Sequence, residues 1–241
     1  MKILKKLRVV IVILGMLFFL LCAIIIIKEY KDIRTEEKLE NEIIKIEKQM
    51  TIKNIDAGKE SIDTGKLITT GEYKKVEEAF KKYSQVYYKQ AKNIHQNYKD
   101  ILDNDVEKVE NIEQEKPDFE NTTSELKTLK EMIEQENKNY EELISTSTIT
   151  SFIEKATERY YVNYYKENIN SLKRKSFSKS IKKELNNSLE LINAKIELII
   201  FLKNNKDWEI IDNKIQYEDE EFQKEYESYL DNIQIINKNN K

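Results

Sequence analysis

The stretch SFSKSIKKELNNSLELINAKIELIIFL, residues 176–202, decides the fold class of this 241-residue chain. Its large apolar residues recur every three or four positions, the repeat that places side chains on one face of an α-helix. This apolar stripe is the cleanest in the chain and consists of Phe177, Ile181, Leu185, Leu189, Ile192, Ile196, Ile199 and Leu202. The run Leu198–Leu202 widens it, so we expect this helix to lie at the centre of an all-α bundle.

Helical apolar patterns also flank this stretch. Residues 28–55 predict a membrane-proximal helix that packs on the bundle, because Leu39, Ile43 and Ile46 share one face. Residues 56–71 hold three of the four glycines and predict a turn region. The bundle domain, with antiparallel helices, is expected over residues 72–241.

Capping residues and helix breakers set the boundaries inside the bundle domain. Its first helix is expected to open with a capping box at Thr69–Glu72. Asp103–Asp105 could break this helix, but Pro117 is the firmer stop. The remaining predicted helices start at Asp118, at a second capping box at Ser151–Glu154, and at about Glu218, with a bend or break near residues 171–178.

The segment WEIIDNKIQY, residues 208–217, departs from the helical pattern. Its residues alternate about the pair Asp212–Asn213, which favours the tight turn of a β-hairpin. Since an isolated hairpin is marginally stable in water, Trp208 is expected to pack on the bundle. The sequence therefore predicts one small β element near the end of an otherwise helical chain.

The run VVIVILGMLFFLLCAIIII, residues 9–27, contains no charged residue. At about 1.5 Å per residue it can cross the ~30 Å hydrocarbon core of a bilayer, so it predicts a transmembrane helix. A cleaved signal peptide and a lipid anchor at Cys22 are the alternatives. The run is too long for the first, and Leu21 stands where lipidation needs a small residue. We expect a retained, single-pass anchor.

Charges beside this run predict its orientation in the cell membrane. Four basic residues and no acid precede it in residues 1–8, whereas three bases and two acids follow it in residues 28–34. Lys and Arg resist translocation, so the basic tail 1–8 is expected in the cytoplasm and the bundle outside. A cytoplasmic bundle is the alternative.

The composition narrows the classes of function. The formal net charge is −3, and without the four bases of the tail 37 basic residues face 44 acidic ones. Nucleic acid is not an expected partner, because phosphate binding needs a basic face. The chain has no glycine after Gly71, so it lacks the glycines of phosphate loops, dinucleotide fingerprints and nucleophile elbows. Cys22 is the only cysteine, so no disulfide can form within the chain.

No residue pattern predicts a catalytic, cofactor-binding or metal site. His95 is the only histidine and lies at the edge of an apolar face, where a packing role is expected. Three Ser-x-x-Lys tetrads occur without the Lys-Thr-Gly element that accompanies them in penicillin-recognising enzymes. Asp103–Glu107 resembles a calcium loop, but Lys108 replaces the glycine that its tight turn needs. We expect a protein that is not an enzyme and binds no cofactor.

Two clusters are candidates for an interaction surface. The first, the basic patch, could meet anionic wall polymers or lipid headgroups and consists of Lys173, Arg174, Lys175, Lys179, Lys182 and Lys183. The second, the tyrosine cluster, could bind a sugar or peptide and consists of Tyr160, Tyr161, Tyr164 and Tyr165. A solvated helix face and core packing are the respective alternatives.

The overall plan also resembles a known group of proteins. It combines a basic tail, one span, a helical body rich in Lys, Glu and Tyr, and a closing W-x-I-x-[DN]-x-K-I-x-[FY] element, Trp208–Tyr217, before an F-x-x-x-Y helix. This plan is similar to uncharacterised single-span membrane-anchored helical proteins of low-GC Gram-positive bacteria. The resemblance implies a place in the cell envelope and no particular activity.

These features together predict a membrane-anchored, extracytoplasmic helical protein that serves as a non-catalytic interaction or scaffold protein of the cell envelope. Its expected partners are the lipid bilayer and a protein or wall polymer. Two alternatives are a sensing ectodomain that binds a ligand or peptide between helices and a cytoplasm-facing membrane scaffold. The long apolar stripes also suit a coiled-coil homo-oligomer.

Overall fold

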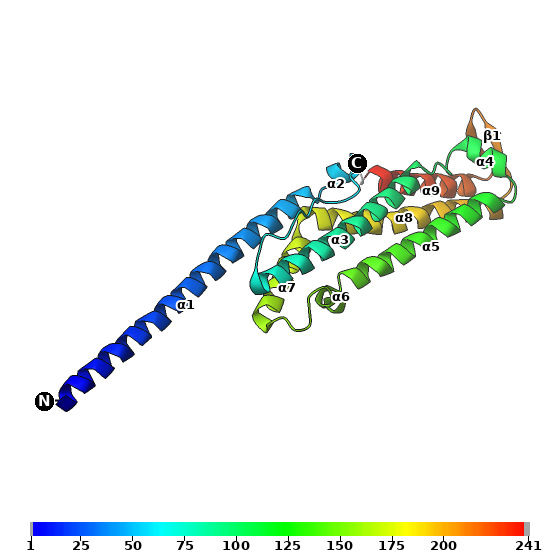
Figure 1. Ribbon diagram of the computed structural model, residues 1–241. Helices are drawn as coiled ribbons and strands as arrows, with labels where there is room; N and C mark the ends of the chain where they lie inside the picture. Colours follow the sequence, from blue (N-terminus) through cyan, green and yellow to red (C-terminus); the bar gives the residue numbers. More distant parts are fainter. Residues whose placement is uncertain (1, 239–241) are drawn as a thin grey trace.

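The computed structural model describes residues 2–238, with side chains from residue 13 onward. A long helix leaves one end of an elongated helical bundle, and a small hairpin closes the other end (Figure 1). The elements are α1 (Lys2–Gln49), α2 (Ile52–Asp56), α3 (Gly71–Asp103), α4 (Val109–Glu115), α5 (Glu120–Leu143), α6 (Thr146–Ser151), α7 (Arg159–Arg174), α8 (Ser176–Asn204), β1 (Trp208–Ile211), β2 (Lys214–Tyr217) and α9 (Glu220–Lys238). The all-α fold class with one hairpin is confirmed.

Helix α8 lies at the centre of the bundle, as its apolar stripe predicts. It packs against α3, α5, α7 and α9. Leu185, Ile192 and Leu202 are buried in these contacts, whereas Leu189 and Ile196 are only partly buried. The buried face also contains a charged residue, Lys195, whose side chain has no exposed surface.

Side-chain pairs give the relative directions of the helices. Tyr87 meets Tyr140 and Asn104 meets Glu125, so α3 and α5 run antiparallel. Helix α1 runs parallel to α3, because residues 57–70 form an irregular return segment between α2 and the start of α3 (Figure 1). The predicted turn region thus contains the return segment, which brings the chain back to the start of the bundle.

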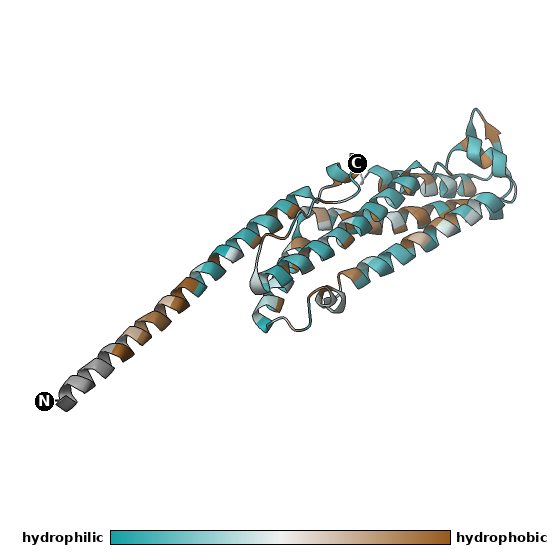
Figure 2. Cartoon of the chain, in the orientation of Figure 1, coloured by the Kyte–Doolittle hydropathy of each residue, from teal (hydrophilic) through white to brown (hydrophobic). Residues whose placement is uncertain are grey.

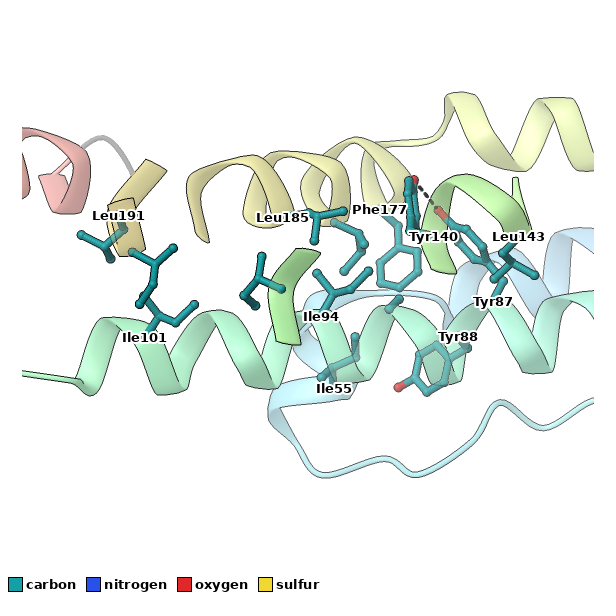
Figure 3. Close-up of a cluster of buried hydrophobic side chains, with 14 of the residues drawn as sticks. Ile55, Tyr87, Tyr88, Ile94, Ile101, Tyr140, Leu143, Phe177, Leu185 and Leu191 are labelled. Atoms are coloured by element: carbon teal, nitrogen blue, oxygen red, sulfur yellow. Dashed lines mark hydrogen bonds between the residues drawn. The ribbon is translucent and has the colours of Figure 1, made fainter. Parts of the chain in front are cut away.

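Aromatic rings fill the middle of the core (Figure 3). The Phe177 ring from α8 lies between Tyr87 and Tyr88 of α3, with ring centroids 6.3 Å from each. The Tyr87 and Tyr140 hydroxyl groups are 3.4 Å apart, so one can donate a hydrogen bond to the other. Such pairing lowers the cost of burying a phenol hydroxyl group.

Helix α1 continues without a break from the apolar run into the bundle. The helix is long and apolar enough to cross a membrane, and its apolar part is not covered by the rest of the chain (Figure 2). From Leu39 onward its inner face is buried against the bundle. The basic tail 1–8 lies outside the residues whose side chains the structure describes.

The membrane-proximal helix is shorter than residues 28–55 suggest. Helix α1 ends at Gln49, and Thr51 takes the N-cap position of a separate short helix, α2. The Thr51 hydroxyl accepts a hydrogen bond from the backbone N–H of Asn54 at 3.1 Å. This local capping favours a new helix start over continuation of α1.

Both predicted capping boxes are wrong. Helix α3 begins at Gly71 without a side-chain cap, and the Thr69 hydroxyl instead donates to Glu77 at 2.6 Å. Ser151 is the last residue of α6, and the next helix begins only at Arg159. The hydroxyl that does cap a helix here belongs to Ser145, which accepts from the N–H of Thr148.

The structure fixes two further helix boundaries. The favoured stop at Pro117 is wrong, because α3 already ends at Asp103 and Asn104 is extended. The Lys195 ammonium of α8 binds the carbonyls of Ile101 and Asn104 at this end. The expected interruption near residues 171–178 is a break at Lys175, which serves as the C-cap of α7 and the N-cap of α8. Helices α7 and α8 can therefore point in different directions.

The predicted hairpin is present. Trp208 pairs with Tyr217, and Ile211 pairs with Lys214 across the turn. Asp212 and Asn213 take φ values of +50° and +59°, the left-handed conformation that a tight two-residue turn requires. Trp208 lies against Phe119 with ring centroids 6.5 Å apart, so the hairpin packs on the bundle as expected.

Candidate functional site

The tyrosine cluster lies at the junction of α1, α3 and α7. The Tyr73 hydroxyl of α3 donates to a carboxylate oxygen of Glu36 on α1 at 2.6 Å. The rings of Tyr161 and Tyr164 from α7 meet the Tyr73 ring edge to face, at 4.9 and 5.9 Å. The cluster therefore joins the start of α3 and of α7 to α1 at Glu36.

Its members differ in exposure. Tyr165 is buried, Tyr161 and Tyr164 are partly buried, and the Tyr160 side chain is 57% exposed. Burial, and then the hydrogen bond to Glu36, raises the pKa of Tyr73. Burial also raises the pKa of Tyr164 to about 12. The cluster is mainly a packed junction, with one ring left at the surface.

A buried charge cluster lies next to this junction. The Lys81 ammonium on α3 contacts carboxylate oxygens of Glu77 at 2.6 Å and of Glu42 on α1 at 3.1 Å. Glu77 and Lys81 are 1% and 5% exposed. The three side chains, here called the Glu77 cluster, hold α1 against α3.

The Glu77 cluster also holds the return segment. Glu77 accepts hydrogen bonds from the backbone N–H groups of Ile68 and Thr69, at 3.0 and 2.9 Å. Burial opposes ionisation of Glu77, but the hydrogen bonds from Lys81 and Thr69 outweigh it and hold its pKa below the usual range. One carboxylate thus fixes the return segment on α3, and its ion pair with Lys81 extends the contact to α1.

The basic patch lies at the turn from α7 to α8, and several of its charges contact other elements. Lys175 pairs with Glu47 of α1 at 3.1 Å, and Lys182 lies 3.7 Å from Glu141 of α5. The Lys173 ammonium donates to the backbone carbonyl of Ile144 at 2.9 Å. Arg174, Lys179, Lys182 and Lys183 are exposed. The patch is partly a set of contacts between helices.

His95 is held on both sides by carboxylates. Its Nδ1 lies 2.9 Å from Glu184 of α8, and its Nε2 lies 3.1 Å from Asp56 of α2. Asp56 also pairs with Lys99. The Glu184 hydrogen bond is the main reason that the pKa of His95 is raised, and the Lys99 and His95 hydrogen bonds lower the pKa of Asp56. A protonated imidazole suits this arrangement, which joins α2, α3 and α8.

Lys195 closes the end of α3. Its ammonium donates to the backbone carbonyls of Ile101, at 3.0 Å, and Asn104, and lies 3.5 Å from Glu107. Cations are favourable at helix C-termini, where backbone carbonyls lack partners. Burial nevertheless lowers the pKa of Lys195. This buried charge serves as a cap supplied by another helix.

An acidic hollow of about 550 Å³ opens beside the same helix end. Its lining includes Asp100, Asp103, Asp105, Glu115 and Glu125. Among residues 13–238 no group of three or more His, Cys, Asp or Glu side chains is placed to hold a metal ion. The acids instead bind neighbours, as in the contact of 2.5 Å between Asp105 and Lys108.

A mainly apolar hollow of about 190 Å³ lies between α5 and α8. Leu126, Ile196, Ile199 and Ile200 line it, with Lys127 and Lys203 at its rim. Pockets that enclose a drug-sized ligand usually measure about 300–1,000 Å³. This hollow is small for such a ligand.

Comparison with known proteins adds no name to these sites. No protein-family model, curated protein or solved structure matches the chain.

The sequence missed three of these groups. Lys195 could have been found, because it stands at a helical spacing from Leu191, Ile192 and Leu198 and so falls on the buried face. Glu77 and the two carboxylates beside His95 carry no such signal. Their roles depend on which helices meet, and helix pairing cannot be read from the periodicity of one segment.

Proposed function

We propose that this protein is a membrane-anchored, non-catalytic scaffold of the cell envelope, whose bundle stands outside the cell and binds a protein or wall polymer. The observation that carries the proposal is the continuity of α1. One unbroken helix contains the apolar run and, from Leu39 onward, part of the bundle core. The bundle is thereby fixed relative to the segment that would cross the membrane, as suits a protein that presents a surface.

Contacts along α1 support this rigid coupling. Glu36 accepts from Tyr73, Glu42 pairs with Lys81, and Glu47 pairs with Lys175. The three acids are spaced over three turns of α1 and meet side chains from α3 and from the turn between α7 and α8. Bending α1 within this region would break at least one of these contacts.

The contacts of the His95 imidazole and the Lys195 ammonium support the non-catalytic part of the proposal. Both ring nitrogens of His95 face carboxylates, which leaves neither nitrogen free as a general base. The ammonium of Lys195 faces backbone carbonyls and is fully buried. Both side chains join helices.

The sensing alternative has less support. It needs a ligand-sized space beside the tyrosine cluster, but the rings of Tyr73, Tyr161 and Tyr164 pack edge to face against one another. A ligand would have to displace these contacts. The outward-facing surface of the bundle is therefore the better candidate for binding.

Cysteine labelling tests the anchor and its orientation. In a Cys22→Ala background, Lys138→Cys places a thiol on the exposed face of α5, and Lys6→Cys places one in the basic tail. We expect a membrane-impermeant maleimide to label Lys138→Cys in intact cells and Lys6→Cys only after lysis. The protein should stay in the membrane pellet after alkaline carbonate extraction.

Other outcomes separate the alternatives. Labelling of Lys6→Cys in intact cells, with Lys138→Cys protected until lysis, would show a cytoplasmic bundle. Release of the protein by carbonate would overturn the anchor itself. Crosslinking through a photoreactive residue at exposed Lys179 then identifies what the basic patch contacts.

A further inference from the structure

The first turn of α7 lies close to the level at which α1 leaves the apolar run. Helix α1 rises about 1.5 Å per residue, so Asp32 and Glu36 lie about 8 and 14 Å beyond Ile27 along its axis. Tyr73 binds Glu36, and Tyr161 packs on Tyr73. The polar layer of a bilayer extends about 5–8 Å beyond the hydrocarbon core on each side. Asp32 thus lies at the outer edge of that layer, and Glu36 lies about 6 Å farther out. Burial, and then the nearby charge of Asp32, raises the pKa of Tyr161, so Tyr161 of α7 is close to Asp32.

Large side chains are exposed at this level. Tyr30 and Tyr160 are 59% and 57% exposed, and Ile33 is 64% exposed. On a helical wheel of 100° per residue, Tyr30 and Ile33 lie 180° and 120° from buried Leu39, on the side of α1 away from the bundle. Tyrosine is enriched at membrane interfaces because its ring is apolar and its hydroxyl is polar. A bilayer surface would cover the side chains that the bundle leaves exposed.

Cations lie on the same segments as these side chains, and the residue before Lys155, Glu154, pairs with Lys75 near the start of α3 at 3.4 Å. Lys31, Arg34, Lys155 and Arg159 are exposed, and none is in an ion pair with another described residue. The Arg34 guanidinium lies 5.6 Å from the centre of the Tyr30 ring. Two acids near this level already have partners, because Glu36 accepts from Tyr73 and Glu154 pairs with Lys75. Within residues 29–34 and 155–160, the acids that form no ion pair with another described residue are Glu29, Asp32 and Glu158, one fewer than the four cations. The charges therefore favour an anionic surface.

The basic patch does not share this position. Lys175 contacts Glu47, which lies about 30 Å beyond Ile27 along α1. Charges at that distance are screened from a bilayer surface, because the Debye length is about 8 Å at physiological ionic strength. Lipid headgroups therefore fit the start of α7 better than the basic patch.

We propose that the membrane-facing end of the bundle rests in the lipid headgroup layer and binds phosphate groups of anionic lipids. This end consists of Tyr30, Lys31 and Arg34 of α1, Lys155 before α7, and Arg159 and Tyr160 of α7. The cations contact phosphates and the two tyrosine rings enter the interface. The inference rests on the proposed membrane anchor. Its consequence is a bundle that sits on the membrane and does not stand clear of it.

Spin labelling of the full-length chain tests this contact. In a Cys22→Ala background, Glu158→Cys carries a nitroxide beside the cations, and Lys214→Cys carries one in the distant hairpin. The protein is placed in nanodiscs of phosphatidylcholine with or without 30% phosphatidylglycerol, both containing a headgroup-chelated nickel lipid. We expect nickel-induced relaxation at position 158 to rise at least threefold with phosphatidylglycerol, and at position 214 to stay at background.

A matched pair of variants assigns the effect. The triple variant with Lys155→Gln, Arg159→Gln and Tyr160→Ser should return relaxation at position 158 to its phosphatidylcholine value. Lys155 and Arg159 are exposed, and Tyr160 is 57% exposed with its ring centroid 5.1 Å from that of Tyr161. The control, Lys179→Gln with Lys182→Gln in the basic patch, should leave it unchanged. Equal relaxation at position 158 in both lipids, or no effect of the triple variant, overturns the inference.

The remaining outcomes separate this inference from the anchor. Protein that carbonate releases from vesicles of the same lipids overturns both. Protein that stays in the vesicles but shows no lipid dependence overturns the headgroup contact alone. A second copy of the chain is the last alternative occupant of this end. Dipolar broadening between labels at position 158 that appears at high protein density in vesicles, but not at one chain per nanodisc, would assign this end to a second copy. That result would also overturn the headgroup contact.

Discussion

Three oxygen-bearing groups surround the ammonium of Lys195, which lies in the apolar face of α8. The carbonyls of Ile101 and Asn104 belong to the last turn of α3 and the residue after it, where no intrahelical N–H is left to bind them. A lysine from a neighbouring helix fills the role that a local cap usually takes. These contacts offset part of the cost of burying the charge, because burial still lowers the pKa of Lys195.

Lys195→Met should lower the free energy of unfolding by about 2 kcal/mol. Methionine keeps the length of the side chain but leaves two carbonyls without a donor, at about 1–3 kcal/mol for a buried unsatisfied group, partly offset by removing a buried charge. Urea unfolding in mild detergent, followed by circular dichroism, measures the change. Lys203→Met, an exposed change on the same helix, should stay within about 0.5 kcal/mol. An equally stable Lys195→Met would show that desolvation outweighs the capping contacts.

His95 should make stability depend on pH near neutrality. Its folded-state pKa is raised, so its contribution is complete below the unfolded value of about 6.5 and is lost as pH rises through the folded value. We expect the free energy of unfolding to fall as pH rises above the unfolded value of about 6.5, and urea unfolding at a series of pH values measures this change.

The His95→Gln variant provides the control. Glutamine can hydrogen-bond both Glu184 and Asp56 but does not titrate, so its stability should be flat over the same range. Asp56 acts in the opposite direction at low pH. Its lowered pKa means that its contribution is lost only as pH falls below the usual carboxylate range. A wild-type profile that matched His95→Gln would contradict the imidazolium assignment.

At the scale of elements, the Glu77 cluster joins three segments that are separate in the sequence. A double-mutant cycle with Glu77→Gln and Lys81→Met measures this coupling. Each single change leaves one buried charge without its main partner, which typically costs about 3–5 kcal/mol. The double variant should therefore lose 1–3 kcal/mol less than the sum of the single losses.

The chain supplies a matched control one residue away. Glu78 and Lys82 have the same i,i+4 spacing and a contact of 2.7 Å, but their side chains are 47% and 61% exposed. The same cycle at this pair should give a coupling of about 0.5 kcal/mol or less. Equal coupling at the two pairs would mean that burial of the Glu77 cluster does not strengthen it.

Element positions could be predicted from the sequence where one segment decides them. The stripe of α8 and the hairpin around Asp212–Asn213 are such cases, because periodicity and turn residues act locally. The capping-box predictions failed for the opposite reason. Thr69 has a buried carboxylate within reach, and Glu77 competes with the helix N-terminus for its hydroxyl. Tertiary contacts of this kind overrule a local motif.

The candidate sites also combine features that one segment determines with features that only tertiary contacts determine. The tyrosine cluster and the basic patch could be found as runs of one residue type, but their separation along α1 could not. That separation depends on α7 starting near Glu36 and ending near Glu47, which only the packing of α7 along α1 determines. The residues could therefore be located from the sequence, but their distance along α1 from the apolar run could not.

At the scale of the molecule, buried tyrosines should cause alkaline unfolding. Burial raises the pKa values of a set distributed through the core: Tyr83, Tyr87, Tyr140, Tyr165, Tyr217 and Tyr226. A raised pKa stabilises the fold below the unfolded value of about 10, and this stabilisation is lost as pH rises further. We expect phenolate absorbance at 295 nm from these residues to increase in one step, together with loss of the helical circular dichroism signal.

Tyr140→Phe and Tyr87→Phe, combined, provide the comparison. The pair keeps the packed rings and removes two hydroxyl groups that ionise on unfolding, so the midpoint of alkaline unfolding should move to higher pH. Gradual phenolate formation with an intact helical signal would show that water reaches the core before the bundle opens.

The unbroken helix α1 also sets how the bundle is rotated about the axis of α1 relative to the apolar run. Each residue of an α-helix turns the chain by about 100°, so one residue inserted between Ile33 and Leu39 would rotate the bundle by about 100° about the axis of α1. Seven inserted residues would bring the bundle back to within about 20° of its original orientation and move it about 10 Å along the axis of α1. The length of α1 between the apolar run and the bundle therefore also sets which side of the bundle faces a given direction, and insertions of about seven, eleven or eighteen residues come within about 20° of the original orientation.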